Sequence, residues 1–344
     1  MMDWWLAGTI AAFSCVLTGI VRHYALARNL LDVPNARSSH VMPTPRGGGV
    51  AIVLGFVVAT AWAYFQGEVG TWAIACFAGA GGIVAVVGFL DDHGHIAARW
   101  RLVAHFVASA IAMYALGGMP TLQLGSYALD PMWLRMAIGI LFFVWMLNLY
   151  NFMDGIDGIA GVEAITVCAS ACLLYWLNGD EPLLTLPSLL AFAVLGFQVW
   201  NFPPAKIFMG DAGSGFLGFT LGVLAIQAAW TDPVYFWVWC ILLGVFIVDA
   251  TFTLLRRLLT GSKVYEAHRT HAYQYAARRA GSHWRVTLGV AVANVLWLLP
   301  IAVLVASGSL NGCVGVIVAY LPLVALAIFF EAGKRETPTV AATR

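Results

Sequence analysis

The sequence predicts an all-α protein with about eleven helices that cross a membrane. Hydrophobic residues fill 61% of the 344 positions, charged residues only 10%, and the mean hydropathy is +0.84, which exceeds the range of soluble domains. A membrane-crossing helix needs about 20 mostly apolar residues. The apolar runs cover residues 3–21, 48–65, 71–90, 102–117, 133–150, 158–177, 183–200, 213–230, 234–255, 286–306 and 311–330.

The cations predict the orientation of these helices. Short loops rich in Lys and Arg stay on the cytoplasmic side. With a periplasmic N-terminus and a cytoplasmic C-terminus, only Arg135 of the 18 Lys and Arg residues falls outside. The first run lacks a basic segment before it and Arg22 follows it, so we expect a retained span rather than a cleaved signal peptide. The predicted inner loops are residues 22–47, 91–101, 151–157, 201–212 and 256–285.

The six cysteines all lie inside apolar runs, and no Cys-x-x-Cys is present. Neither a disulfide framework nor a zinc site is therefore expected. No internal repeat stands out, so we expect residues 1–344 to form a single transmembrane domain.

Carboxylates gather where the apolar runs end, on the predicted cytoplasmic side. An acid beside a membrane span is costly unless it holds a metal or a proton, which makes these acids candidates for chemistry. An ion-coupled transporter with a cytosol-facing site is the alternative; it predicts acids near the membrane midplane and repeat symmetry, and neither is evident. The acids are Asp91, Asp92, Asp154, Asp157, Asp211 and Asp249, of which Asp249 is expected to support the neighbouring basic loop.

The first two inner loops offer an arginine and an acidic pair. Arg46 precedes three glycines, residues 47–49, at the start of the second run. Glycines at a helix start let backbone N–H groups approach an anion, and an arginine adds a bidentate donor, although a cationic anchor at lipid head groups is the simpler alternative. Asp91 and Asp92 end the third run, where the helix dipole and mutual repulsion disfavour both charges. We expect this pair to bind a cation.

The third inner loop gives the strongest local pattern. Asn151, Asp154 and Asp157 recur every third residue, so in a tight helical turn their side chains would point the same way. One amide and two carboxylates are hard oxygen ligands suited to Mg²⁺ or Mn²⁺.

The fourth inner loop leads into a glycine-rich helix start at Asp211. Free N–H groups and the helix dipole there favour a phosphate, and Asp211 could hold a metal against it, with an N-cap as the structural alternative. Lys206 supplies a point charge, and Phe208 an aromatic face for a base.

The last large inner loop carries His268, Arg269 and His271. Two histidines at positions i and i+3 around an arginine form a basic platform for hydrogen bonds. Contact with anionic lipid head groups is the competing explanation; we favour it for the arginine pairs of this loop but not for its histidines.

Four motifs in these loops carry a resemblance to a known family. They are Asp91-Asp92, Asn148-x-x-Asn151-Phe-Met-Asp154-Gly-x-Asp157-Gly, Phe208-Met-Gly-Asp211-x-Gly-Ser and His268-x-x-His271. The combination resembles the polyprenyl-phosphate N-acetylhexosamine-1-phosphate transferases, glycosyltransferase family 4. That family includes phospho-N-acetylmuramoyl-pentapeptide transferase and enzymes that begin O-antigen synthesis. The resemblance spans residues 31–275 and covers every inner loop.

The resemblance implies a role for each matching residue. Asp211 and, as in some members, Asn151 would bind Mg²⁺, or alternatively Mn²⁺, and Phe208 would stack on uracil. The matching catalytic or nucleophile-orienting acids are Asp91, Asp92, Asp154 and Asp157. The remaining expected substrate-binding residues are Arg46, Asn148, Lys206, His268, Arg269 and His271.

The implied reaction moves an N-acetylhexosamine-1-phosphate from a UDP-sugar to undecaprenyl phosphate in the lipid bilayer and releases UMP. The implied setting is the bacterial inner membrane, with the site facing the cytoplasm, at the first membrane step of lipopolysaccharide O-antigen or other cell-surface polysaccharide synthesis. No nucleic-acid partner is expected, and a homodimer stays open. The loop from His268 to Gln274 lacks the His-x-His-His form of the N-acetylglucosamine enzymes and is similar to members that use a 6-deoxy N-acetylhexosamine, so the donor sugar stays open too.

Overall fold

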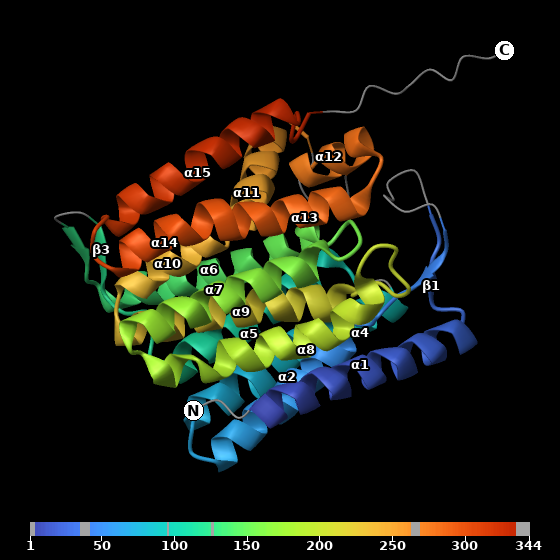
Figure 1. Ribbon diagram of the computed structural model, residues 1–344, viewed down its shortest axis with the longest axis horizontal. Helices are drawn as coiled ribbons and strands as arrows, with labels where there is room; N and C mark the ends of the chain where they lie inside the picture. The colour runs from blue at the N-terminus through green and yellow to red at the C-terminus, as the bar shows by residue number, and fades with distance from the viewer. Residues whose placement is uncertain (1–3, 35–41, 95, 125–126, 263–268, 335–344) are drawn as a thin grey trace.

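The protein is built almost entirely from helices. The computed structural model describes residues 4–34, 42–94, 96–124, 127–262 and 269–334. Figure 1 shows long helices lying side by side, and two small hairpins interrupt them. In these hairpins β1 (Leu31–Asp32) pairs with β2 (Thr44–Pro45), and β3 (Leu122–Leu124) with β4 (Tyr127–Leu129), both antiparallel. The predicted all-α class is confirmed.

Every predicted apolar run coincides with helix. In chain order the helices are α1 (Trp4–Ala27), α2 (Val50–Phe65), α3 (Thr71–Ala73), η1 (Ile74–Ala80), α4 (Gly81–His93), α5 (Ala98–Ala115), α6 (Met132–Met153), α7 (Ile159–Asn178), η2 (Glu181–Leu183), α8 (Thr185–Asn201), α9 (Asp211–Thr231), α10 (Val234–Leu242), α11 (Gly244–Leu259), α12 (Ala272–Ala280), α13 (His283–Ala293), η3 (Asn294–Leu298), α14 (Leu299–Ala306) and α15 (Gly312–Phe329).

The lengths of these helices support a protein that crosses a membrane several times. Within the described residues, eight helical segments are long and apolar enough to span, or nine if α10 and α11, which meet at 73°, form one bent span. The helix α2, with 16 residues, is shorter. The polytopic character is confirmed, while the number of eleven and the orientation stay predictions.

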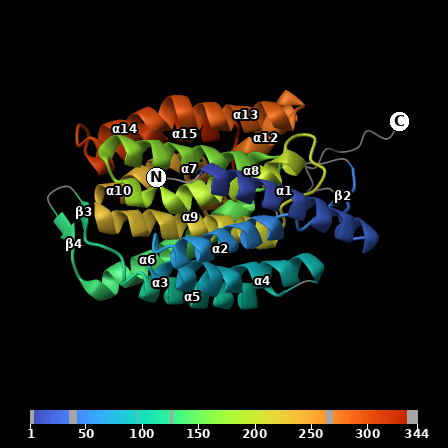
Figure 2. The ribbon, with the colours of Figure 1, turned by 60° about the horizontal axis from the view of Figure 1, so that its bottom comes forward.

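The helix α9 lies at the centre of the bundle, and almost all of its residues are buried. Figures 1 and 2 show it surrounded by other helices, and it packs closely against α4 and α6. Glycines permit this approach, as in other membrane helix pairs. A Cβ on Gly218 would lie 2.4 Å from the carbonyl oxygen of Met146, and one on Gly88 would lie 2.5 Å from the amide nitrogen of Ala212. These contacts fix the start of α9 against the end of α4.

The outer helices expose apolar side chains. In α1 and α15, only 22% and 28% of the residues in the apolar stretch are buried, and Trp5, Leu321 and Phe329 are exposed. Charged residues are scarce on these helices. An apolar outer surface of this kind matches a bilayer as the surrounding solvent.

Replacing Gly88 by alanine should destabilise the protein by about 1–3 kcal/mol, since the added methyl group meets the backbone of α9 rather than a side chain that can move. Thermal unfolding of the detergent-solubilised protein measures the effect. Gly82→Ala, in the same helix with nothing within 4 Å of its Cβ, should be neutral or slightly stabilising. Equal unfolding temperatures for the two variants would contradict the close approach of α4 and α9.

Candidate functional site

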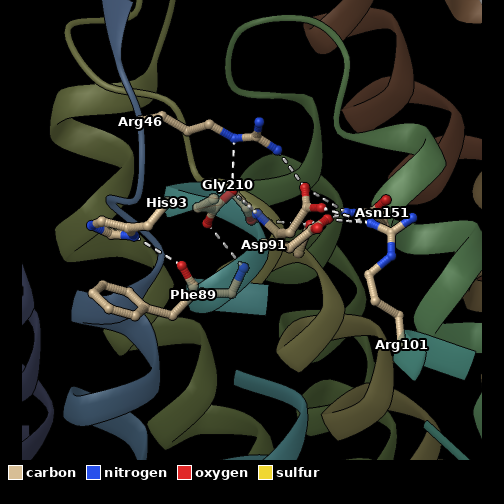
Figure 3. A network of polar contacts seen from close by, with 11 residues as sticks. Arg46, Phe89, Asp91, His93, Arg101, Asn151 and Gly210 are labelled. Atoms are coloured by element: carbon tan, nitrogen blue, oxygen red, sulfur yellow. Dashed lines mark hydrogen bonds and ion pairs between the residues drawn. The ribbon is translucent and has the colours of Figure 1, made fainter. Parts of the chain in front are cut away.

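Asp211, the first residue of α9, takes part in a network of ion pairs and hydrogen bonds. Figure 3 shows this network, with Arg46, Asp91, Arg101 and Asn151 labelled. Its Oδ1 pairs with Nη2 of Arg46 and accepts a hydrogen bond from Nδ2 of Asn151 at 3.1 Å. Its Oδ2 lies 3.3 Å from Nη1 of Arg101, a guanidinium that also pairs with Asp91. The ends of α4, α5, α6 and α9, together with the segment before α2, thus meet at one carboxylate.

Asp92 caps the start of α9. Its carboxylate accepts hydrogen bonds from the amide of Asp211 at 3.0 Å and that of Ala212 at 3.3 Å, and its Oδ1 lies 2.8 Å from Nε of Arg46. Gly210 makes room for this contact, since its φ is +79° and a Cβ there would lie 2.5 Å from Asp92 Oδ2. An acid at a helix N-terminus is favourable for the helix dipole. The prediction that these N–H groups are free for a phosphate is therefore wrong.

The glycine-rich segment before α2 does not bind an anion through its backbone either. The amides of residues 47 and 48 donate to the carbonyl oxygen of Phe208 at 3.2 and 2.9 Å. The amide of Gly49 donates to the carbonyl oxygen of Met209 at 2.8 Å. The amide of Phe208 in turn donates to Pro45. Buried backbone groups are paired in folded proteins, and here the pairing ties the Arg46 segment to the loop that carries Phe208.

The side chains of Asn151, Asp154 and Asp157 do not share one helical face, so that expectation was wrong. The helix α6 ends before Asp154, whose φ and ψ are −87° and 50°, and the chain turns there. Asn151 points to Asp211, whereas Asp157 accepts a hydrogen bond from the amide of Ala205 at 3.0 Å and lies 3.2 Å from Nδ1 of His283. Asp157 thus connects the turn to the loop before α9 and to α13.

Electrostatics around Asp154 favour an added positive charge. Burial raises the pKa of its carboxyl group well above the usual value; Arg46 opposes the rise, and Asp211, Asp92 and Asp157 add to it. For Arg46, burial lowers the pKa of the guanidinium, but the acids around it outweigh this, and its pKa is raised.

Acids outnumber arginines in this network. Three carboxylates pair with two guanidinium groups, which leaves one negative charge in excess, and the carboxyl group of Asp154 lies close enough to feel these charges. The paired carboxylates belong to Asp91, Asp92 and Asp211, and the guanidinium groups to Arg46 and Arg101.

Two cavities adjoin the network. One, of about 450 Å³, is lined by Asp211, Asn151, Asn148 and His271. The other, of about 560 Å³, is lined by Phe208, Asp157 and His283. Gln274 lines both, so the two cavities are neighbours.

His271 begins α12 and is held by Asp249. Its Nδ1 lies 3.3 Å from Asp249 Oδ1, and the Asp249 carboxylate also accepts from the amides of Ala272 and Tyr273, at 2.9 Å each. The expected supporting role of Asp249 is confirmed. Asn148 lines the same cavity as His271 and donates to the carbonyl oxygen of Val144 at 2.6 Å.

Two of the predicted substrate-binding residues, Lys206 and Arg269, make contacts away from Asp211. The ammonium group of Lys206 is exposed and lies 5.7 Å from the centroid of the Trp200 ring. The carbonyl oxygen of half-buried Arg269 accepts a hydrogen bond from Arg278. His268 lies outside the described residues.

The sequence reasoning missed Arg101, Ser214 and His105. Arg101 bridges two acids, and a cation in the first turn of an apolar helix was a usable signal. Ser214 accepts a hydrogen bond from Asn151 at 2.9 Å and was already part of the motif around Asp211. His105, one turn beyond Arg101, lines the smaller cavity.

The chain is similar in sequence to known proteins. The family model described as glycosyl transferase family 4 matches residues 72–229. A probable undecaprenyl-phosphate N-acetylglucosaminyl 1-phosphate transferase of Bacillus subtilis is 28% identical over 75% of this chain and 72% of its own length. A decaprenyl-phosphate N-acetylglucosaminephosphotransferase of Mycolicibacterium smegmatis is 32% identical over 64% of this chain and 59% of its own length. A phospho-N-acetylmuramoyl-pentapeptide-transferase of Rhodopseudomonas palustris is 30% identical over 66% and 71%.

The family match and the names of these relatives identify a membrane transferase. The chain belongs to glycosyl transferase family 4. The family match covers α4, α5, α6 and the start of α9, which supply most of the network around Asp211.

Proposed function

We propose that the protein transfers an N-acetylhexosamine-1-phosphate from a UDP-sugar to undecaprenyl phosphate and releases UMP. The observation that carries the proposal is the convergence of Arg46, Arg101 and Asn151 on Asp211 beside two adjoining cavities. Both substrates are anionic, and phosphoryl transfer depends mostly on positioning and on neutralising charge. The names of the Bacillus and Mycolicibacterium relatives point to the same substrate classes.

The residues around Asp211 fit Mg²⁺ as the cofactor. No three His, Cys, Asp or Glu side chains form a metal cage among the residues that the structure describes, but Mg²⁺ in phosphate-transferring sites is held by one or two carboxylates together with waters and substrate phosphates. Asp211 and Asp154, with the amide oxygen of Asn151, would hold it, and a divalent ion beside Asp154 would favour the charged form of this carboxyl group, whose pKa is raised without one. When bound, Mg²⁺ would neutralise phosphate charge and act as a Lewis acid.

The protein side chains would then bind and orient the phosphate groups. Arg46 and Arg101 bear bidentate donors that can turn from carboxylates to phosphate oxygens. Asp91 holds Arg101 in place by accepting from it, and the amide of Ile96 donates to the same carboxylate at 2.8 Å. Because a phosphate monoester with a second pKa of about 6 is already mostly a dianion at neutral pH, the acceptor needs orientation more than deprotonation. We favour a single in-line attack, with an aspartyl-phosphate intermediate as the open alternative.

We assign the uridine of the donor to the larger cavity, of about 560 Å³. Phe208 and the edge of the proline turn at residues 203–204 line it. Aromatic faces stack on bases with useful strength, about 1–3 kcal/mol per base. Asp157, by joining the loop before α9 to His283, would hold this wall of the cavity in position.

The donor sugar and the pathway are the finer part of the proposal. The resemblance of the loop from His268 to Gln274 to members that use a 6-deoxy N-acetylhexosamine implies such a donor and a role at the start of O-antigen synthesis. The names of the bacillary and mycobacterial relatives instead contain N-acetylglucosamine. We place the protein in the bacterial inner membrane with its site toward the cytoplasm, on the distribution of cations.

A donor panel tests the function directly. The purified protein, undecaprenyl phosphate and Mg²⁺ are incubated in turn with UDP-N-acetylglucosamine, UDP-N-acetylgalactosamine, UDP-N-acetylfucosamine and UDP-N-acetylquinovosamine, and UMP is measured. We expect UMP release and a sugar-diphosphate lipid with one of them. The absence of UMP with every donor would reject the transferase proposal for these substrates.

Replacing Phe208 by alanine should raise the KM for the UDP-sugar by about 5- to 100-fold, the cost of about 1–3 kcal/mol of lost stacking, and leave kcat within a few-fold. Steady-state kinetics with the donor found above provides the measurement. Phe202→Leu, in the same loop but outside both cavities, is the control. A fall in kcat at unchanged KM would place Phe208 elsewhere in the reaction.

A further inference from the structure

His105 is a polar side chain that the reaction described above does not use. It lies in α5, four residues after Arg101, so both side chains occupy one face of the helix. Both line the cavity of about 450 Å³ next to Asp211. Among the described residues, Nδ1 of His105 is buried and has no hydrogen-bond partner.

A buried polar atom without a protein partner requires an explanation, and a ligand is one of them. The surroundings indicate which kind. Arg101, whose guanidinium carries five N–H groups, lines the same cavity, and its Nη1 contacts Asp91 and Asp211. A guanidinium and an imidazole at one space suit an acceptor with many oxygens, and a phosphate has this property.

The position of α5 indicates which of the two phosphate-bearing substrates, the lipid acceptor or the UDP-sugar, would bind beside His105. Next to His105 on the chain, Val103, Phe106 and Val107 are 51%, 38% and 48% exposed. Such an apolar surface on a helix of a multi-pass protein faces lipid. The cavity of His105 therefore lies just inside a lipid-facing helix, whereas the cavity with Phe208 is formed by loops and α12 and α13, with Gln274 between the two.

We propose that His105 binds the phosphate group of the lipid acceptor. This inference rests on the proposed function, because that function supplies two phosphate-bearing substrates. The imidazole donates a hydrogen bond to a phosphate oxygen, while Arg101 balances the charge of the same group. His105 thereby holds the attacking phosphate beside Asp211 and away from the uridine cavity.

Binding measurements test the role of His105 without any donor sugar. Farnesyl phosphate, a short polyprenyl phosphate, is titrated by calorimetry into the Mg²⁺-loaded full-length protein in detergent, and neutral farnesol and UMP are titrated in parallel. His105→Ala should weaken farnesyl phosphate binding about 10-fold, as expected for a lost hydrogen bond to a charged group, and leave farnesol and UMP unchanged. His105→Gln, which keeps an N–H donor, should restore most of the affinity.

Ser109→Ala is the matched control. Ser109 lies one turn further along α5 and lines neither cavity, and its buried hydroxyl has no hydrogen-bond partner within the described part of the chain. This variant should bind all three ligands like the wild type. Unchanged farnesyl phosphate binding in His105→Ala, or an equal loss of UMP affinity, would overturn the inference. A wild-type protein that binds farnesyl phosphate through His105 but releases no UMP would instead reject only the transfer reaction.

Discussion

Asp211→Asn should lower the rate of sugar-phosphate transfer by about a thousandfold or more. The substitution keeps the size of the side chain and removes its charge, at the point where Arg46, Arg101 and Asn151 converge. Loss of one preorganised electrostatic group costs about 10²- to 10³-fold in other enzymes, and loss of a metal-binding charge adds to this. UMP release under saturating substrates measures the effect.

A control variant is needed to show that a lower rate of Asp211→Asn does not come from misfolding. Asp232→Asn, at the other end of α9, is the matched variant: Asp232 accepts from the amide of Val234 at 2.9 Å in an exposed position, which an asparagine also satisfies. Both variants should reach wild-type levels in membranes and unfold at similar temperatures. Activity of Asp211→Asn within tenfold of wild type would reject a metal-binding role.

Asp92→Ala should reduce the stability of the protein, by about 2–4 kcal/mol. The side chain of Asp92 is 3% exposed, caps the start of α9 and pairs with Arg46. A lost cap costs about 1 kcal/mol, and breaking a buried ion pair costs more, discounted here because the Arg46 side chain is 37% exposed. The unfolding temperature of the detergent-solubilised protein should fall by several degrees.

Asp92→Asn provides the contrast, since it keeps an oxygen that can accept from one of the two amides. It should retain more stability than the alanine variant. Asp91→Ala should mainly impair turnover, because Asp91 holds Arg101 rather than a helix start. If Asp92→Ala unfolded like wild type and only turnover fell, Asp92 would act on substrate and not on α9.

These two variants also separate residues that the sequence presented as one unit. Adjacent acids predicted a pair sharing one cation, yet in the structure each has its own arginine: Asp91 pairs with Arg101 and Asp92 with Arg46. Consecutive side chains on a helix point about 100° apart. Which arginine each would meet depended on how α5 and the segment before α2 pack against α4.

Much of the site could be predicted because its residues follow local rules. Carboxylates are rare in apolar runs and costly there, so Asp92 and Asp211 were recognisable before any fold was known. Their use was not. Free N–H groups were expected at the start of α9, but hydrogen bonds to Asp92 use them, and the glycine N–H groups before α2 bond to the loop at Phe208 and Met209.

The sequence by itself determined that this protein is a helical membrane protein and that its chemistry lies at the ends of its helices, because apolar length and the cost of a buried charge can both be read from a single chain. Only the tertiary structure decided that Asp211 receives both arginines, that Asp157 faces His283 and that His105 lies beside Arg101 in a cavity. Hydrogen bonds act over about 3 Å, and the packing of helices far apart in sequence sets distances on that scale.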